Sequence, residues 1–274
     1  MGERRRIDLR GQLGKLSPKG KIYEELERGA LLENIYGFIP AGDSTDISLL
    51  IANLGALLAG KGKSVCILDA KVFYPSVYKL VGCGAGPKGK GLLAAIKSEK
   101  ADFREEITGT RHKNLYIMSA SPSDTMEDYF DVKEDEVERI IAALKDMFDI
   151  VLIDIPNIPP LEFCYVSMKC CNMGFVVWSE RIECPQNTSR LLHFINSIGI
   201  GASKFANVII SNEMGINYDR KVIDEMNLRL IAQIPFAQGV VDYSLEGKAY
   251  VAGSVLMDRR YSKSIYRLAD IIVE

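Results

Sequence analysis

The chain has 274 residues, of which 47% are hydrophobic, and this is enough to bury one large core or two modest ones. Its 34 basic and 36 acidic residues give a formal net charge of −2, which argues against general binding to nucleic acid. No run of about 18 apolar residues occurs, so no stretch is long enough to cross a membrane.

The first 30 residues are predicted to form a basic arm, separate from a domain over residues 31–274. Few acids precede Glu24 in this arm, whose basic residues are Arg4, Arg5, Arg6, Arg10, Lys15, Lys19 and Lys21. Two interpretations stay open: a solvated arm that leads into a short helix, or an electrostatic contact with anionic lipid or a protein partner. The first residues lack the apolar core of a signal peptide. The six cysteines include no C-x-x-C pair, and we expect thiols in apolar strands, such as Cys66, to be buried and reduced, which fits a cytoplasmic protein.

From residue 34 onward, apolar strands alternate with helices. Strands are predicted over 35–39, 65–68, 115–118, 150–153, 174–178, 206–210 and 230–234. Helices are predicted over 47–59, 92–98, 134–148, 161–169, 189–198, 220–226 and 260–273. This alternation at βαβ spacing predicts an α/β fold, with a doubly wound, mostly parallel sheet and helices on both faces, as in P-loop NTPases.

The turn between the first strand and the first helix lies where a phosphate-binding loop is expected, because backbone N–H groups converge at a helix N-terminus. The P-loop pattern is G-x-x-x-x-G-K-[ST]. Aligned on the helix, residues 41–48 lack both glycines of the pattern, and Ile47 stands at the lysine position. No Lys or Arg occurs in residues 31–60, and the loop carries Asp43 and Asp46 instead. The scaffold of a nucleotide site is predicted without its main phosphate-binding cation.

The residues that follow the strands are further candidates, because ligands bind beyond the carboxyl ends of the strands in such sheets. Asp69 and Asp154 each close an apolar strand. Lys71 lies two residues after Asp69, and Asn212 lies just after the strand over 206–210. An Asp in this place often holds a metal-bound water or orients a catalytic group. The alternative is a carboxylate that caps the next loop or helix, and both interpretations stay open.

Several runs resemble the MinD/ParA group of deviant P-loop ATPases, in the same order along residues 34–274. These runs are 36–38, 51–54, 62–69, 74–77, 114–120, 149–154, 208–212, 234–236 and 240–247. Within the group, the chain looks most like the CpaE/TadZ proteins of Tad (Flp) pilus assembly. The resemblance implies a P-loop NTPase fold and, as family cofactors, ATP or ADP with Mg²⁺.

Carried over by position, the resemblance shows losses as well as matches. The family's signature lysine falls on Gly42, and its P-loop lysine falls on Ile47. Ser48 matches the hydroxyl on the Mg²⁺ side. Asp69 matches the first Asp after the second strand, and Lys71 replaces the Asp that helps to activate the attacking water. Asp154 matches the Walker B-like Asp, and Asn212 matches the residue that reads the adenine.

The resemblance therefore predicts a vestigial or weak nucleotide site, made of Gly42, Ser48, Asp69, Lys71, Asp154 and Asn212. We assign no catalytic residue and no metal ligand, because both lysines and the water-activating carboxylate are missing. One hypothesis is a pseudo-ATPase that serves as a localisation or assembly scaffold, as in pilus biogenesis. The other is an active ATPase in which Lys71 is a relocated catalytic lysine. For Lys71 itself we expect an ion pair with Asp43 or Asp46, or else contact with a bound anion.

The expected partners are proteins of a larger assembly, with a homodimer and a membrane surface as further candidates. The last helix carries an apolar stripe of Tyr261, Ile265, Leu268 and Ile272 beside basic residues. Such a helix can lie on the inner face of the membrane, as the tails of MinD-like proteins do. The alternative is a helix that docks on the sheet. Association with DNA is disfavoured by the near-neutral charge.

Overall fold

The computed structural model describes residues 34–42, 47–84, 91–98, 103–212, 214–215, 220–253 and 258–273. The predicted basic arm over residues 1–30 lies outside these described residues. The loop acids Asp43 and Asp46 lie outside them as well.

One sheet organises the described chain. Its strands are β1 (Ile35–Pro40), β2 (Val65–Asp69), β3 (Thr108–Gly109), β4 (Leu115–Met118), β5 (Ile150–Asp154), β6 (Met173–Trp178), β7 (Asn207–Ser211) and β8 (Arg229–Ile234). They lie in the order β3-β4-β2-β5-β1-β6-β7-β8. Every neighbouring pair is parallel except β3 with β4. Strands β2 and β5 are buried along their whole length, as expected for parallel strands that are covered on both faces.

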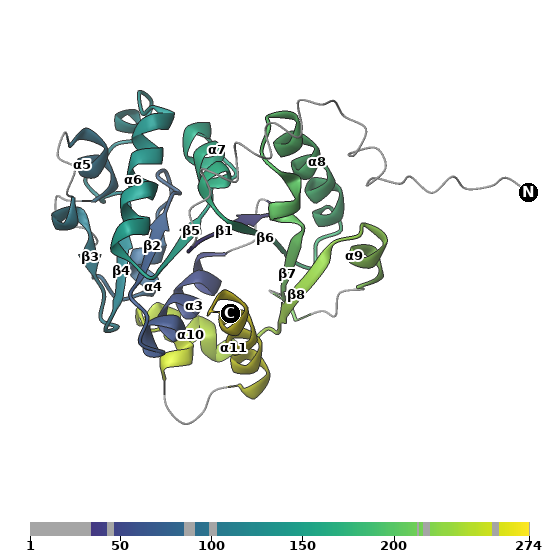
Figure 1. Cartoon of the computed structure of the whole chain (residues 1–274). Helices are drawn as coiled ribbons and strands as arrows, with labels where there is room; N and C mark the ends of the chain where they lie inside the picture. The colour runs from purple at the N-terminus through teal and green to yellow at the C-terminus, as the bar shows by residue number, and fades with distance from the viewer. Residues whose placement is uncertain are drawn as a thin grey trace, which may run out of the picture.

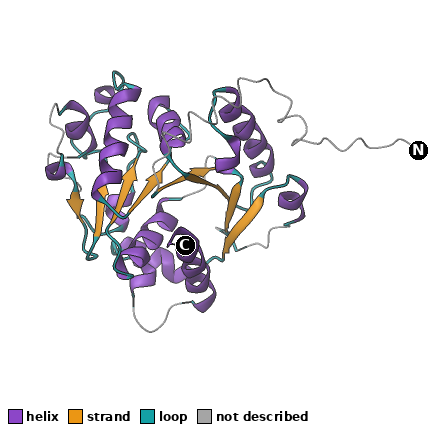
Figure 2. Cartoon of the chain, viewed as in Figure 1, coloured by secondary structure: helices purple, strands orange, loops and turns teal. Residues whose placement is uncertain are grey.

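Helices cover both faces of the sheet (Figures 1 and 2). One face carries α5 (Leu92–Lys97), α6 (Glu134–Met147), α7 (Leu161–Cys170), α8 (Cys184–Ser197) and α9 (Lys221–Glu225). The other face carries α3 (Ser48–Gly60), α4 (Val77–Leu80), α10 (Gln238–Leu245) and α11 (Arg259–Val273). Short 3-10 turns are η1 (Arg104–Glu106), η2 (Glu127–Tyr129), η3 (Ala202–Phe205) and η4 (Tyr250–Ala252). The predicted doubly wound α/β fold is therefore confirmed.

Helix α3 is almost completely enclosed. All of its residues are buried except Leu49 and Gly60, which is typical of a helix that is apolar on every side. Its one buried amide, Asn53, accepts a hydrogen bond from the backbone N–H of Val251 at 3.2 Å and donates one to the Leu49 carbonyl at 2.9 Å. This packing fixes where the helix begins, and Ser48 is its first residue.

Helix α11 is docked through its apolar stripe. Tyr261, Ile265, Leu268 and Ile272 are all buried, and they belong to the same core as α3. The Tyr36 hydroxyl also donates a hydrogen bond to the Ile272 carbonyl at 2.8 Å. The docked alternative is therefore correct, and the expectation that this stripe lies on a membrane is wrong for the folded chain. No helix among the described residues is long and apolar enough to span a bilayer.

Some element boundaries differ from the sequence prediction. Helix α8 begins at Cys184 rather than at residue 189, because Pro185 is tolerated in the first helical turn. The short elements β3, α4 and α10 were not predicted, because elements of this length are too short to show a clear hydrophobic periodicity. The six cysteines, all within the described ranges, are free, as expected for a reduced chain.

Because α11 is docked on the core, shortening one of its buried side chains should lower the stability of the fold. Leu268 is 0% exposed, so Leu268→Ala should lower the free energy of unfolding by about 2–5 kcal/mol. Leu245 is 82% exposed on α10, so the matched change Leu245→Ala should alter it by less than about 0.5 kcal/mol. Urea denaturation of both variants checks this expectation, and equal losses would contradict the docked arrangement.

Candidate functional site

Three elements converge at the carboxyl edge of the sheet. Strands β2 and β5 are neighbours, and their last residues, Asp69 and Asp154, are paired in register. Helix α3 follows β1, which is the other neighbour of β5, and brings Ser48 to the same edge. Ser48, Asp69 and Asp154 are all 0% exposed. The structure thus brings together three residues that the sequence placed in one candidate site.

Asp69 is a capping residue in this structure. One carboxylate oxygen, Oδ2, accepts hydrogen bonds from the backbone N–H groups of Ser76 at 2.9 Å and Val77 at 3.1 Å. The other, Oδ1, accepts one from the backbone N–H of Lys71 at 3.3 Å. These contacts hold the loop after β2 and the start of α4. For Asp69, the capping interpretation of the sequence is therefore correct.

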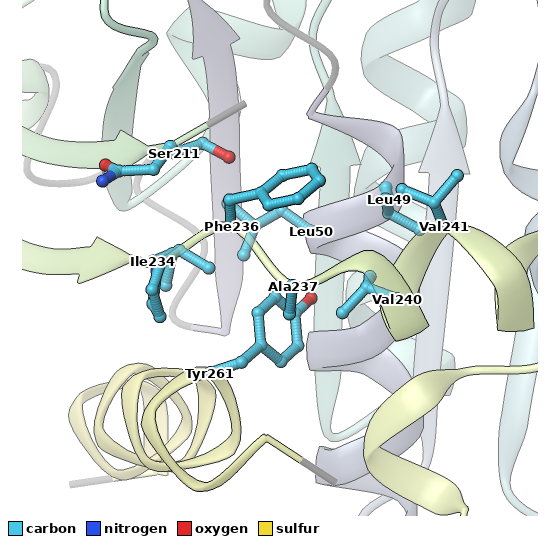
Figure 3. Close-up of a pocket in the computed structure, with 11 residues that line it drawn as sticks. Leu49, Leu50, Ser211, Ile234, Phe236, Ala237, Val240, Val241 and Tyr261 are labelled. Carbon is cyan, nitrogen blue, oxygen red and sulfur yellow. The ribbon is translucent and has the colours of Figure 1, made fainter. Parts of the chain in front are cut away.

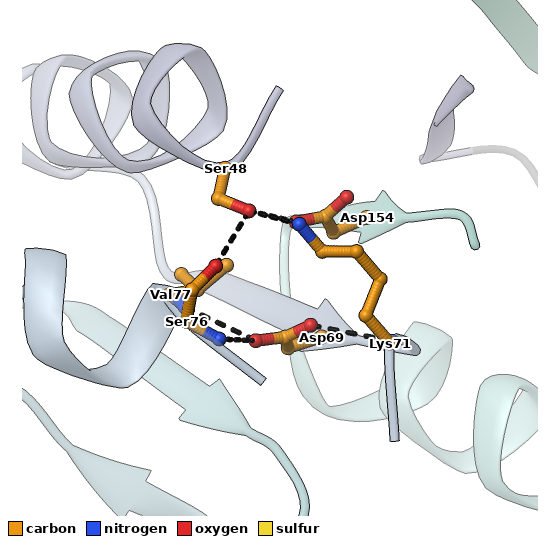
Figure 4. Close-up of polar contacts among 6 residues, drawn as sticks. All are labelled: Ser48, Asp69, Lys71, Ser76, Val77 and Asp154. Carbon is orange, nitrogen blue, oxygen red and sulfur yellow. Dashed lines mark hydrogen bonds and ion pairs between the residues drawn. The ribbon is translucent and has the colours of Figure 1, made fainter. Parts of the chain in front are cut away.

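Lys71 extends across the cluster to Asp154 (Figure 4). Its Nζ lies 2.9 Å from Asp154 Oδ2, and it also donates a hydrogen bond to the Ser48 hydroxyl. The Ser48 hydroxyl in turn donates to Asp154 Oδ2 at 2.6 Å. Lys71 thus forms an internal ion pair whose described partner is Asp154. The partners predicted from sequence, Asp43 and Asp46, lie outside the described residues.

Ser76 is a member of the cluster that sequence reasoning missed. Its hydroxyl donates a hydrogen bond to Ser48 Oγ at 2.9 Å. Ser76 stands at the N-cap position of α4, where serine is common, but its side chain does not cap the helix. A hydroxyl has one proton and two lone pairs. The Ser48 hydroxyl therefore uses its whole capacity, since it donates to Asp154 and accepts from Ser76 and Lys71.

Burial sets the electrostatics of the two acids. It is the main reason that the pKa of Asp154 is raised to about 7; the Lys71 ammonium acts in the lowering direction, and the neighbouring Asp69 carboxylate adds a smaller raising effect. Burial also raises the pKa of Asp69, against the lowering effect of Lys71 and of three backbone N–H donors. Asp154 Oδ1 is buried and accepts no hydrogen bond from the described residues. Lys71 is therefore the cation that lets this buried carboxylate ionise.

A pocket of about 150 Å³ forms the second part of the site (Figure 3). Strand β7 brings Ser211 and Asn212 to it, and the turn after β8 brings Pro235 and Phe236. The other lining residues are mostly apolar and come from α3, β8, α10 and α11: Leu49, Leu50, Ile234, Ala237, Val240, Val241 and Tyr261. The Asn212 backbone N–H donates to the Ile234 carbonyl at 2.9 Å, which fixes the start of this loop.

The predicted site residues therefore fall into two groups on one edge of the sheet. Ser48, Asp69, Lys71 and Asp154 gather at the ends of β2 and β5, whereas Asn212 lines the pocket beyond β7. Gly42 is buried just after β1, which lies between β5 and β7 in the strand order. The start of α3 lies between the two groups, because Ser48 belongs to the charged cluster and Leu49 and Leu50 line the mainly apolar pocket.

The buried ion pair predicts a pH-dependent cost of removing Lys71. Lys71→Met should lower the free energy of unfolding by about 3 kcal/mol at pH 8, since it leaves the Asp154 charge buried without its partner. Asp154 has a folded-state pKa above the unfolded value of about 3.9, so the folded chain gains a proton as the pH falls from 8 to 5. The deficit of the variant should therefore shrink at pH 5, as measured by urea denaturation.

Lys169 offers a matched control for this experiment. It forms an ion pair with Glu138 at 3.2 Å, but both side chains are more than 40% exposed. Lys169→Met should cost at most about 1 kcal/mol, at either pH. A Lys71→Met deficit that is as small as that of Lys169→Met, or that grows toward pH 5, would contradict the ion-pair account.

The sequence and the fold of this chain are similar to those of known proteins. No family model matches the chain. The septum site-determining protein MinD of Thermotoga maritima is 24% identical over 232 residues, which is 80% of each chain. The structure of MinD from Pyrococcus horikoshii OT3, complexed with Mg-ADP, is 19% identical with a TM-score of 0.71, over 87% of this chain and 95% of that one. A ParA family ATPase from Chlorobium tepidum TLS is 14% identical with a TM-score of 0.69, over 86% and 98%. The chain therefore has the fold of the MinD/ParA P-loop ATPases.

Proposed function

We propose that this chain is a pseudo-ATPase with the MinD/ParA fold, which acts as a localisation or assembly scaffold. The observation that carries the proposal is the ion pair between Lys71 and Asp154. P-loop NTPases hold Mg²⁺ between the Ser or Thr of the loop and the Walker B Asp. In this chain those two positions are Ser48 and Asp154, and both contact the Lys71 ammonium.

The residues present do not fit Mg²⁺. This ion requires near-octahedral oxygen ligands at about 2.0–2.1 Å. The Ser48 hydroxyl has no lone pair left, since it accepts from Ser76 and Lys71. Asp154 Oδ2 already accepts from Ser48 and Lys71. Phosphoryl transfer depends on cations that neutralise and position the phosphates, and Ile47 stands where the P-loop lysine is expected. These losses support a chain that does not hydrolyse ATP.

The competing hypothesis is an ATPase that uses Lys71 as its relocated lysine. Lys71 would then have to leave Asp154 and Ser48 to reach a phosphate. That movement would strand a fully buried carboxylate, and breaking a buried ion pair in this way is costly. The ion pair therefore favours the scaffold over the relocated lysine.

The scaffold role rests on the fold of the relatives. One Aquifex aeolicus structure with a TM-score of 0.71 to this chain, at 14% identity, is a MinC:MinD cell division protein complex. By analogy, we propose that this chain binds protein partners of a larger assembly, as a monomer or a homodimer. The resemblance to the CpaE/TadZ branch points to pilus assembly. In this proposal the chain is cytoplasmic, and any contact with the inner face of the membrane uses the basic arm, because the apolar stripe of α11 is buried.

The proposal predicts that purified protein with Mg²⁺ and ATP releases phosphate no faster than buffer alone. The reason is that Ile47 and Lys71 replace the lysine and the water-activating carboxylate expected from the family. Steady-state phosphate release measures this directly. Turnover that disappears in an Asp154→Ala variant would overturn the proposal.

A nucleotide titration separates the two hypotheses further. We expect ATP to bind weakly or not at all, and the affinity to be the same in the wild type and in Lys71→Ala. Lys169→Ala is the matched control, since it removes a lysine from the exposed ion pair with Glu138 and should leave the nucleotide affinity unchanged. Submillimolar ATP binding that is lost in Lys71→Ala would establish the relocated lysine instead.

A further inference from the structure

We propose that Lys71 is a built-in cation, whose ammonium group replaces a divalent metal ion in the charged cluster. The inference rests on the proposed function and deepens it, because it states what took the place of the metal. In this account the wild-type chain neither needs nor binds a divalent ion at the ends of β2 and β5. Removal of the Lys71 ammonium would uncover a site for one.

The contacts of the ammonium carry this inference. Lys71 Nζ lies 2.9 Å from Asp154 Oδ2 and donates to Ser48 Oγ. A carboxylate and a hydroxyl oxygen are ligands that a hard cation such as Mg²⁺ takes, and these two are the pair that holds it in P-loop NTPases. The ammonium of lysine is a compact, strongly hydrated point charge with three donors. It can therefore satisfy the same two oxygens without a metal.

The loop after β2 holds this cation in place. The Lys71 backbone N–H donates to Asp69 Oδ1 at 3.3 Å, and Asp69 also holds Ser76 and Val77 through its other oxygen. The Lys71 side chain is only 20% exposed. The backbone of the lysine is thus tied to one buried acid, and its ammonium is tied to the other. The Asp69 contacts therefore position the Lys71 backbone where its ammonium reaches Asp154.

Charge balance explains why a metal and Lys71 exclude one another. With both acids ionised, Asp69 and Asp154 carry two negative charges, and Lys71 compensates one of them. A divalent ion bound beside Lys71 would face a positive charge at contact distance, and it would find the Ser48 hydroxyl fully used. Without Lys71, a divalent ion would neutralise both acids and would gain Asp154 Oδ1, which has no hydrogen bond from the described residues. The cluster therefore accepts one cation at a time.

The experiment uses Mn²⁺ as the probe, without nucleotide, on the full chain. Electron paramagnetic resonance measures bound Mn²⁺, and thermal denaturation measures its effect on Tm. The wild type should bind no Mn²⁺ in the cluster, and its Tm should not change. Lys71→Ala should bind one equivalent, and Mn²⁺ at about ten times its dissociation constant should raise the Tm by roughly 2–4 °C.

The double variant Lys71→Ala with Asp154→Asn is the matched control, because it lacks the proposed ligand as well as the lysine. It should bind no Mn²⁺ in the cluster. A folded Lys71→Ala variant that does not respond to Mn²⁺, or responds equally in the double variant, would overturn the inference. If Lys71→Ala does not fold even with Mn²⁺, Mn²⁺ binding by the wild type tests the proposal instead. Bound Mn²⁺ that is lost in Asp154→Asn would refute the built-in cation, and its absence would support it.

These results are independent of the ATPase assay. Mn²⁺ binding by a wild type that shows no turnover would refute the built-in cation alone. ATP turnover by a wild type that binds no Mn²⁺ in the cluster would refute the pseudo-ATPase proposal alone. The two proposals can therefore fail separately.

Discussion

The ion pair between Lys71 and Asp154 is the contact on which the charged end of the site depends. Asp154 is fully buried at the end of β5, and a carboxylate in such a place costs several kcal/mol to desolvate unless a cation compensates it. Lys71 supplies this cation from the end of β2, which lies beside β5 in the sheet. The Ser48 hydroxyl joins both groups and ties the first turn of α3 to them. Three side chains thus link two strand ends and a helix start.

This arrangement gives the two parts of the site different characters. In the cluster at β2 and β5, the Lys71 ammonium pairs with Asp154, and backbone N–H groups donate hydrogen bonds to Asp69. The pocket around Asn212 and Phe236 is lined mainly by apolar side chains and lies on the other side of β1. In the proposed pseudo-ATPase, the fold and the pocket are retained, whereas the Lys71 ammonium occupies the side chains of Ser48 and Asp154.

Much of this architecture could be predicted from the sequence. The apolar runs that end in Asp69 and Asp154 read as buried parallel strands, so both acids could be placed at one edge of the sheet. The partner of Lys71 and the role of Ser76 could not be predicted, because both depend on how the loop after β2 folds across α3. The pocket could not be predicted either, since it joins residues from Leu49 to Tyr261. For α11 the apolar stripe could be predicted from the sequence. Whether it packs against the rest of the fold or lies on a membrane depends on tertiary packing, which the sequence pattern does not show.

The most direct test of the account is a high-resolution crystal structure of the wild-type chain, grown with excess Mg²⁺ and a non-hydrolysable ATP analogue. The account predicts that Lys71 Nζ stays within hydrogen-bond distance of Asp154 Oδ2 and Ser48 Oγ, and that no metal ion lies between these oxygens. A structure in which Lys71 has turned away, with Mg²⁺ bound to Ser48 and to the phosphates of the analogue, would contradict it.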